Sequence, residues 1–226
     1  MDALKAIRHR RAVRRYTDQE VPDDDVAALL RLALLAPTGH GAQAWGFVVV
    51  RDPDRRAALV RLLLDGAVDY FRLFRPPAAG TTDEEHAAWA RGYAEEALGD
   101  GYRAVPVWLC AVTVPRFGHD DPVMEHVERF SDVTSVAFAL ENLLVAARAM
   151  GLGTTPTNFH FFREAEYRDL LGLPDEVGVH YLTPLGHPVE FPVGLRPAMA
   201  KARRPWRTLV HEEEFGATWQ EEGAAA

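Results

Sequence analysis

The stretch Phe130-Ser-Asp-Val-Thr-Ser-Val-Ala-Phe-Ala-Leu-Glu-Asn-Leu-Leu-Val-Ala-Ala-Arg-Ala-Met150 is the most strongly helical part of the chain. Its small and aliphatic side chains recur at the spacing of one helix face, at Val136, Ala137, Leu140, Leu143, Leu144 and Ala147. Gly151-Leu152-Gly153 follows directly and predicts the end of the helix. We therefore expect a buried central helix against which the other elements pack.

Short apolar runs lie on both sides of this helix in the sequence. They are typical of buried strands and cover residues 45–50, 105–114 and 177–185. Pro184 is expected to break the third strand, because proline has no N–H to donate to a sheet. The sequence therefore predicts a small sheet beside the central helix.

Helix signals outweigh strand signals along the chain. Further helices are expected over 2–9, from Val21-Pro22, from Asp52-Pro53, near 83–98 and over 163–171. No internal repeat or linker divides the sequence, so we predict one α+β domain over residues 1–226. Residues 66–104 carry scattered aromatic side chains and are read either as a lid or insertion over a site or as a peripheral pair of helices. Residues 196–226 form a predicted C-terminal extension.

Composition and charge exclude several classes of partner. The chain has 226 residues, with 25 Lys or Arg and 33 Asp or Glu, so its formal net charge is −8 with His neutral. This charge argues against a general nucleic-acid binder and against a polybasic membrane anchor. No targeting segment is recognised and no apolar run approaches the ~20 residues that span a bilayer. We therefore expect a cytoplasmic protein with no nucleic-acid and no membrane partner.

The positive charge gathers in two clusters near opposite ends of the chain. Residues 8–15 read Arg-His-Arg-Arg-Ala-Val-Arg-Arg, and residues 201–207 read Lys-Ala-Arg-Arg-Pro-Trp-Arg. One reading is two solvated surface patches. The other is that both clusters converge on a small anion such as a phosphate group, which the planar fork of Arg binds through two hydrogen bonds.

Side-chain catalysis has little support in the sequence. The serines are Ser131 and Ser135, and neither lies in a Gly-x-Ser-x-Gly motif. The residues nearest to a metal cluster, His119, Asp120, Asp121 and His126, are read as a polar loop entering a helix, and no metal site is expected. The lone Cys110 lies in an apolar run and is expected to be buried. We therefore expect no catalytic side chain, and redox chemistry from a bound cofactor becomes the attractive reading.

Three motifs occur in a fixed order along the chain. They are Arg10-Arg11-Ala12-Val13-Arg14-Arg15-Tyr16, Ala36-Pro37-Thr38-Gly39-His40-Gly41-Ala42-Gln43-Ala44-Trp45, and Asn142-Leu-Leu-Val-Ala-Ala-Arg-Ala-Met-Gly-Leu-Gly-Thr154. Together they resemble the motifs of the FMN-dependent nitroreductase family. The resemblance covers roughly residues 4–211.

This resemblance implies a nitroreductase-like α+β fold, in which helices flank a central, mainly antiparallel sheet. It also implies an intertwined homodimer with two FMN sites, each drawing residues from both chains. The residues that match flavin-binding positions are Arg10, Arg11, Ala12, Arg14, Pro37, Thr38, Gly39, Gly41, Gln43, Pro156, Thr157, Asn158, Lys201 and Arg203. Lys201 and Arg203 match the part that reaches the phosphate, so both basic clusters would neutralise one phosphate.

Three positions depart from the family motifs. Ala12 replaces a Ser and removes a hydroxyl donor, Gly41 replaces an Asn and removes an amide, and Ala44 replaces a Pro. The phosphate-binding residues are all present, so FMN binding is still expected.

The implied activity is that of an FMN-dependent oxidoreductase, which uses NADH or NADPH to reduce a small organic acceptor by ping-pong hydride transfer. The acceptor is a nitroaromatic, a quinone or a related compound. Alternatives within the fold are dehalogenation, flavin breakdown and ring dehydrogenation. A non-catalytic flavin-binding protein and a plain interaction module are the alternatives from other classes.

Overall fold

The computed structural model describes residues 1–195 and 197–219, and the chain divides into two compact units, Met1–Phe191 and Pro192–Ala226. The first unit carries the sheet and most of the helices. The second unit holds a short helix, α8 (Pro197–Ala202), and a 3-10 turn, η4 (Trp206–Thr208). The boundary between the units lies within a few residues of the predicted start of the C-terminal extension.

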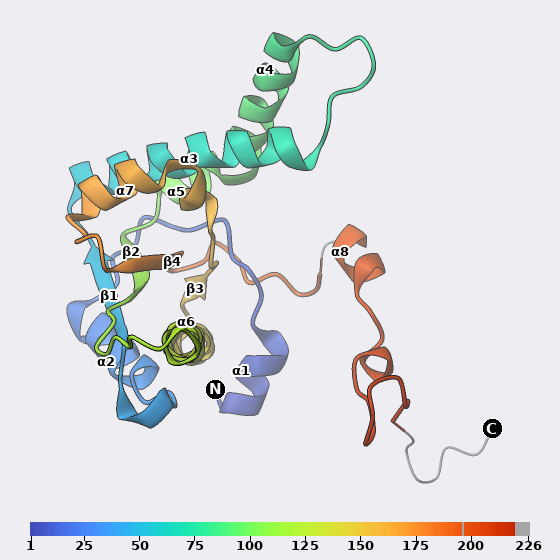
Figure 1. Ribbon diagram of the computed structural model, residues 1–226. Helices are drawn as coiled ribbons and strands as arrows, with labels where there is room; N and C mark the ends of the chain where they lie inside the picture. The colour runs from blue at the N-terminus through green and yellow to red at the C-terminus, as the bar shows by residue number, and fades with distance from the viewer. Residues whose placement is uncertain (196, 220–226) are drawn as a thin grey trace. The chain divides into compact units, whose positions relative to one another are not determined.

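The first unit is built on a four-stranded antiparallel sheet (Figure 1). Its order is β1-β2-β4-β3, and the strands are β1 (Trp45–Val50), β2 (Val107–Thr113), β4 (Gly178–Gly186) and the two-residue β3 (Gly153–Thr154). Three of the four coincide with the predicted apolar runs, while β3 is too short to have left a pattern. The predicted α+β class with an antiparallel sheet is confirmed.

Strand β2 lies in the middle of the unit, and all seven of its residues are buried. Trp108 and Cys110 face a cluster formed with α3 (Pro53–Phe74) and α7 (Glu164–Leu171). Val107 and Leu109 face the other cluster, formed with α2 (Asp23–Ala33) and α6 (Pro122–Ala149). Alternation along one strand thus separates two helical layers, which Figure 1 shows on opposite faces of the sheet.

The predicted central helix is α6, and its C-terminal half packs as expected, with Leu140, Leu143 and Ala147 buried against the sheet. The helix begins eight residues before Phe130, because Asp121 caps it by accepting hydrogen bonds from the N–H groups of Val123 and Met124. Its length and composition would allow it to cross a membrane, yet it serves as the core helix of this unit.

The expected break at Pro184 is wrong, because β4 continues through this residue and pairs it with Trp108. The missing N–H affects the other edge of the strand. There the ladder with β3 ends at Thr154, and the N–H of Thr155 donates to the Thr183 hydroxyl at 3.1 Å. A side-chain hydroxyl, and not a backbone carbonyl of β4, thus accepts the first N–H beyond this ladder.

Residues 66–104 continue the long helix α3 and then form α4 (Asp83–Ala94), a π-helical turn η2 (Glu95–Gly99) and α5 (Asp100–Arg103). Helix α4 starts with a capping box, in which Thr82 and Glu85 satisfy each other's backbone N–H. The end of the segment belongs to the core, since Leu98 and Tyr102 are buried in the cluster around Trp108. Whether the remainder acts as a lid stays a prediction.

Candidate functional site

The basic element at residues 10–14 follows the short helix α1 (Ala3–His9) and is fixed to the sheet by Val13. The Val13 N–H donates to the Thr154 carbonyl at 3.0 Å, and the Tyr16 hydroxyl donates to the Val13 carbonyl at 2.7 Å. The Thr155 hydroxyl contacts the same carbonyl. Val13 is buried while Arg14 is partly exposed, so the anchored backbone directs Arg14 outward.

The guanidinium groups of this element have only some of their possible hydrogen-bond partners within the described chain. Arg10 Nε lies 3.6 Å from Glu141 Oε1 on α6. Arg11 donates to the carbonyls of Arg8 and Arg10 at 3.0 and 2.7 Å, but its buried Nε has no partner among the described residues. A buried donor without an acceptor costs free energy, so this group suits a ligand oxygen.

The segment Pro156–Asn158 lies beside this element, on the same edge of the sheet. Its backbone pairs with β4, since Thr157 N–H donates to the Leu182 carbonyl at 2.8 Å and Leu182 N–H returns a bond at 3.0 Å. Thr157 is 6% exposed, and its hydroxyl oxygen has no partner within the described part of the chain. Asn158 is exposed and precedes the 3-10 turn η3 (Phe159–Arg163). The structure thus brings together two of the predicted flavin-binding segments.

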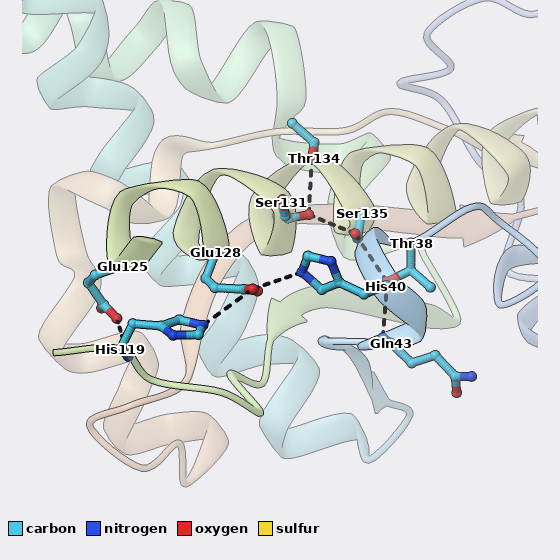
Figure 2. Close-up of polar contacts among 9 residues, drawn as sticks. All are labelled: Thr38, His40, Gln43, His119, Glu125, Glu128, Ser131, Thr134 and Ser135. Atoms are coloured by element: carbon cyan, nitrogen blue, oxygen red, sulfur yellow. Dashed lines mark hydrogen bonds and ion pairs between the residues drawn. The ribbon is translucent and has the colours of Figure 1, made fainter. Parts of the chain in front are cut away.

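The loop Pro37–Gln43, which includes the 3-10 turn η1 (Gly39–Gly41), lies on the N-terminal half of α6. Thr38 Oγ1 accepts a hydrogen bond from the Gln43 N–H at 3.0 Å and lies 3.3 Å from Ser135 Oγ (Figure 2). Gly39 packs tightly on Ser131, whose Cβ would be 3.2 Å from a Cβ at position 39. These contacts fix both ends of the loop.

The middle of this loop has an unusual backbone. His40, Gly41 and Gln43 have φ of 34°, 70° and 51°, in the left-handed region that disfavours side chains with a Cβ. At Gly41, where the family motif has Asn, glycine adopts this conformation without strain. The departure from the motif therefore removes a polar side chain but suits the backbone.

A buried carboxylate holds the tip of the loop, as Figure 2 shows. Glu128 of α6 is 5% exposed, and its Oε1 lies 2.7 Å from His40 Nε2 and 3.5 Å from His119 Nε2. Neither His40 nor Glu128 was predicted as a functional residue. A carboxylate on a helix is normally solvated. Glu128 is buried because the loop folds over it, and the sequence gives no sign of that contact. The described residues contain no group of three or more His, Cys, Asp or Glu side chains arranged to hold a metal.

A second carboxylate on α6 shares this environment. Asp132 is 7% exposed, and burial raises the pKa of its carboxyl group. The charges of Glu128 and Glu125 raise this pKa further, while His40 opposes them. The loop therefore rests on an acidic part of the helix.

The first basic element and the loop contact different sides of α6. Arg10 contacts Glu141 and Thr38 contacts Ser135. Six residues separate Glu141 from Ser135, which places them about 9 Å apart along the axis and about 120° apart around it. Within one chain the structure does not bring these two predicted segments together.

The remaining predicted residues are distributed over both units. Lys201 lies in the last turn of α8, and Arg203 follows that helix in the second unit, where both are exposed. Ala12 and Pro156 are partly buried within the two segments that lie together. A cavity of about 1040 Å³ lies between α3 and α4, and none of the predicted flavin-binding residues lines it.

Comparisons with known proteins agree with this fold. A sequence profile of the nitroreductase family matches residues 7–187. An NADH dehydrogenase of Thermus thermophilus is 28% identical over 214 residues, covering 84% of this chain and 88% of that protein.

Solved structures with the same fold include two flavin enzymes. The NADPH:FMN oxidoreductase of Vibrio harveyi, complexed with NAD+, has a TM-score of 0.68 at 20% identity and covers 97% of this chain and 78% of that one. An iodotyrosine deiodinase bound to FMN and 3-iodo-L-tyrosine has a TM-score of 0.63 at 22% identity, over 86% of this chain and 95% of that one. These likenesses confirm the predicted nitroreductase-like fold.

Proposed function

The chain belongs to the nitroreductase family of flavin oxidoreductases, and on that premise we propose that it binds FMN and uses NADH or NADPH to reduce a small organic acceptor. Nitroaromatics, quinones and related compounds are the acceptor classes to test first. The relatives include a dehydrogenase and a deiodinase, so the acceptor has to be found by assay. The substrate is a small molecule, and an acidic chain of this kind has no evident use for a nucleic-acid partner.

The main support for this proposal is that two of the predicted flavin-binding segments, residues 10–14 and Pro156–Asn158, lie side by side next to β3. Arg10, Arg11 and Arg14 supply positive charge at one side, and Pro156–Asn158 runs along the other. Two buried polar atoms, Arg11 Nε and Thr157 Oγ1, lack partners in the described chain and point to a polar ligand. A flavin mononucleotide, with a phosphate and a polar ring edge, fits this donor set.

When bound, FMN supplies hydride transfer between NAD(P)H and the acceptor. The residues of this chain bind and orient. Arg10, with Lys201 and Arg203, would hold the phosphate through charged hydrogen bonds that contribute about 1.5–3 kcal/mol each. Arg14 would lie at the pyrimidine edge, where its cation stabilises negative charge on the reduced ring. No side chain is needed as a nucleophile.

We also propose that two copies of the chain assemble each site. The loop Pro37–Gln43 and the Arg10 element contact different sides of α6, so the loop of one chain would serve the flavin held by the other. An apolar surface is available for the contact, since α1 and α6 pack together and expose Leu4, Ile7, Val123, Val127, Phe130, Val133 and Phe138. Exposed apolar surface of this extent is typical of a protein interface.

The second unit supports the same assembly. It exposes the bulky side chains of Val193, Trp206, Leu209, Phe215 and Trp219. The second unit would gain stability by burying these side chains against another chain. Reconstitution with FMN followed by NADH or NADPH tests the function, and sedimentation tests the assembly.

A further inference from the structure

His40 and Glu128 form a buried-carboxylate and histidine pair at the tip of the predicted flavin loop (Figure 2). The pair is asymmetric, because the Glu128 side chain is 7% exposed and the His40 side chain is 55% exposed. One edge of the imidazole ring therefore contacts the buried carboxylate, and the rest of the ring is exposed on the outer surface of the loop.

The two ring nitrogens of His40 have different partners. Nε2 lies 2.7 Å from Glu128 Oε1, while Nδ1 has no hydrogen-bond partner in residues 1–195 and 197–219. A carboxylate accepts but cannot donate when it is ionised, so it keeps a proton on Nε2. The second proton of the imidazolium ring is then on Nδ1, where it can leave. A carboxylate that fixes the tautomer in this way prepares a histidine for proton transfer.

We propose that His40 donates, from Nδ1, the proton that accompanies reduction of the acceptor, and that Glu128 positions it. This inference rests on the proposed function, in which the loop Pro37–Gln43 faces a flavin. Reduction of an acceptor by two electrons needs a hydride and a proton, and only the hydride comes from the flavin. His40 is the titratable residue of that loop.

The step balances for a quinone acceptor. The hydride forms one O–H bond and the His40 proton forms the other, so the product is a neutral hydroquinone. The N–H bond breaks with its electron pair left on Nδ1, and the ring becomes neutral with its remaining proton on Nε2, facing Glu128. A proton from water then restores the imidazolium.

Several charged groups surround the pair and would affect its pH dependence. Glu125, Asp132 and Arg129 lie on α6, and Arg129 Nε is 2.6 Å from Glu125 Oε1. His119 shares Glu128, and Arg116 donates to the carbonyl of Ala42 in the loop at 3.2 Å. Of these groups, Asp132 is the rival proton donor, because it is buried beside the loop and burial raises the pKa of its carboxyl group.

The test separates the two halves of the catalytic cycle by stopped-flow absorbance. Reduction of the flavin by NADH or NADPH transfers a hydride alone, so His40→Asn leaves this rate within about twofold. Reoxidation by a quinone needs the proton, so His40→Asn slows it by about 100-fold and Glu128→Gln slows it by a smaller factor. Asn is chosen because it tolerates the left-handed backbone at position 40.

Two matched variants complete the design. His126→Asn changes an exposed histidine on the same helix and is expected to leave both half-reactions unchanged. In the unchanged protein and in His126→Asn, reoxidation slows as pH rises, whereas His40→Asn removes this dependence. If Asp132→Asn removes the dependence and His40→Asn retains it, the assignment to His40 is overturned.

A readout without turnover is the tautomer of His40 in protein labelled with ¹⁵N-histidine. For the neutral ring we expect the Nε2–H form, and Glu128→Gln should abolish this preference. If neutral His40 is found as the Nδ1–H form, Glu128 does not fix its tautomer and the proposal is contradicted. If flavin binds and is reduced normally but reoxidation is unchanged in His40→Asn, only this inference fails. If the protein binds no flavin, the proposed function fails with it.

Discussion

Gly101 lies directly against the carbonyl oxygen of Arg14, so close that a Cβ at position 101 would stand 1.8 Å from that oxygen. Gly101 belongs to α5, which follows the π-helical turn η2 and is buried through Tyr102. The π turn has one residue more than an α-helical turn, so it rotates the residues of α5 around the helix axis. This rotation places Gly101 against the basic element. The helix from the 66–104 segment thus fixes the backbone of a predicted flavin-binding residue.

Replacing Gly101 with alanine should displace the Arg14 backbone, because a Cβ cannot be accommodated without a shift. We expect FMN affinity to fall by at least tenfold and the free energy of unfolding to fall by about 1–3 kcal/mol. Fluorescence titration with FMN and chemical denaturation measure the two effects. Gly92→Ala is the matched control, because a Cβ at position 92 of α4 meets nothing within 4 Å. The control should be neutral or slightly stabilising, by up to about 1 kcal/mol. Equal behaviour of the two variants contradicts the role of Gly101.

Arg10 and Lys201 should bind the same phosphate although they lie near opposite ends of the sequence. Each replacement by alanine should weaken FMN binding by about tenfold or more, the value of one charged hydrogen bond. Riboflavin, which lacks the phosphate, should bind the variants as it binds the unchanged protein. Arg31→Ala, an exposed arginine of α2, is the control for loss of charge alone. A parallel loss of riboflavin affinity would show that these side chains do not act on the phosphate.

The sequence predicted those helices and strands whose structure depends mainly on their own residues. The apolar runs predicted β1, β2 and β4, and the spacing from Val136 to Ala147 predicted the buried part of α6. The first two turns of α6 were missed, because Val123, Val127 and Phe130 are exposed and give no amphipathic pattern with the rest. Only the cap at Asp121 marks that start, and the sequence predicts a polar loop entering a helix there without giving the helix its first residue.

The candidate site was less predictable than the fold. Family motifs gave the segments around Arg10, Thr38 and Thr157, but not the pairing of Glu128 with His40. These two residues are 88 positions apart, and their contact depends on how a loop crosses a helix. The expectation for Pro184 was wrong because its missing N–H lies on the edge away from β2, so the ladder between β2 and β4 continues through it.

His160 should make the protein less stable in mild acid. It is fully buried in η3 against the ring of Tyr167, and burial lowers its pKa from 6.5 to about 4. The unfolded chain takes up the proton first, so stability is complete above pH 6.5 and is lost as pH falls toward 4. The loss should reach about 3 kcal/mol.

Denaturation curves between pH 4 and 8 measure this effect. His160→Met removes the titration and should cost little at pH 8, because a flexible apolar side chain fills the same buried space. His180, whose pKa burial also lowers, is present in both proteins, so the difference between them isolates His160. An unchanged slope in His160→Met would refute the prediction.

Phe130 should lie in the interface between two copies of the chain. It is 65% exposed on α6, and a charge there opposes burial, so Phe130→Glu should yield a monomer that retains little flavin. Sedimentation velocity and the flavin-to-protein absorbance ratio measure both results. Leu73→Glu is the control, because Leu73 is 73% exposed on α3 and lies outside the proposed contact. A dimer that survives Phe130→Glu with its flavin argues against this interface.

The visible absorption spectrum of the purified protein, recorded after incubation with FMN, removal of free flavin and anaerobic addition of NADH or NADPH, tests the flavin function most directly. We expect the two bands of an oxidised flavin near one equivalent per chain, bleached by at least one of the two nicotinamides. The bands should return when a quinone is added. A protein that stays colourless after incubation with FMN, or whose bound flavin neither nicotinamide bleaches, would contradict the proposed function.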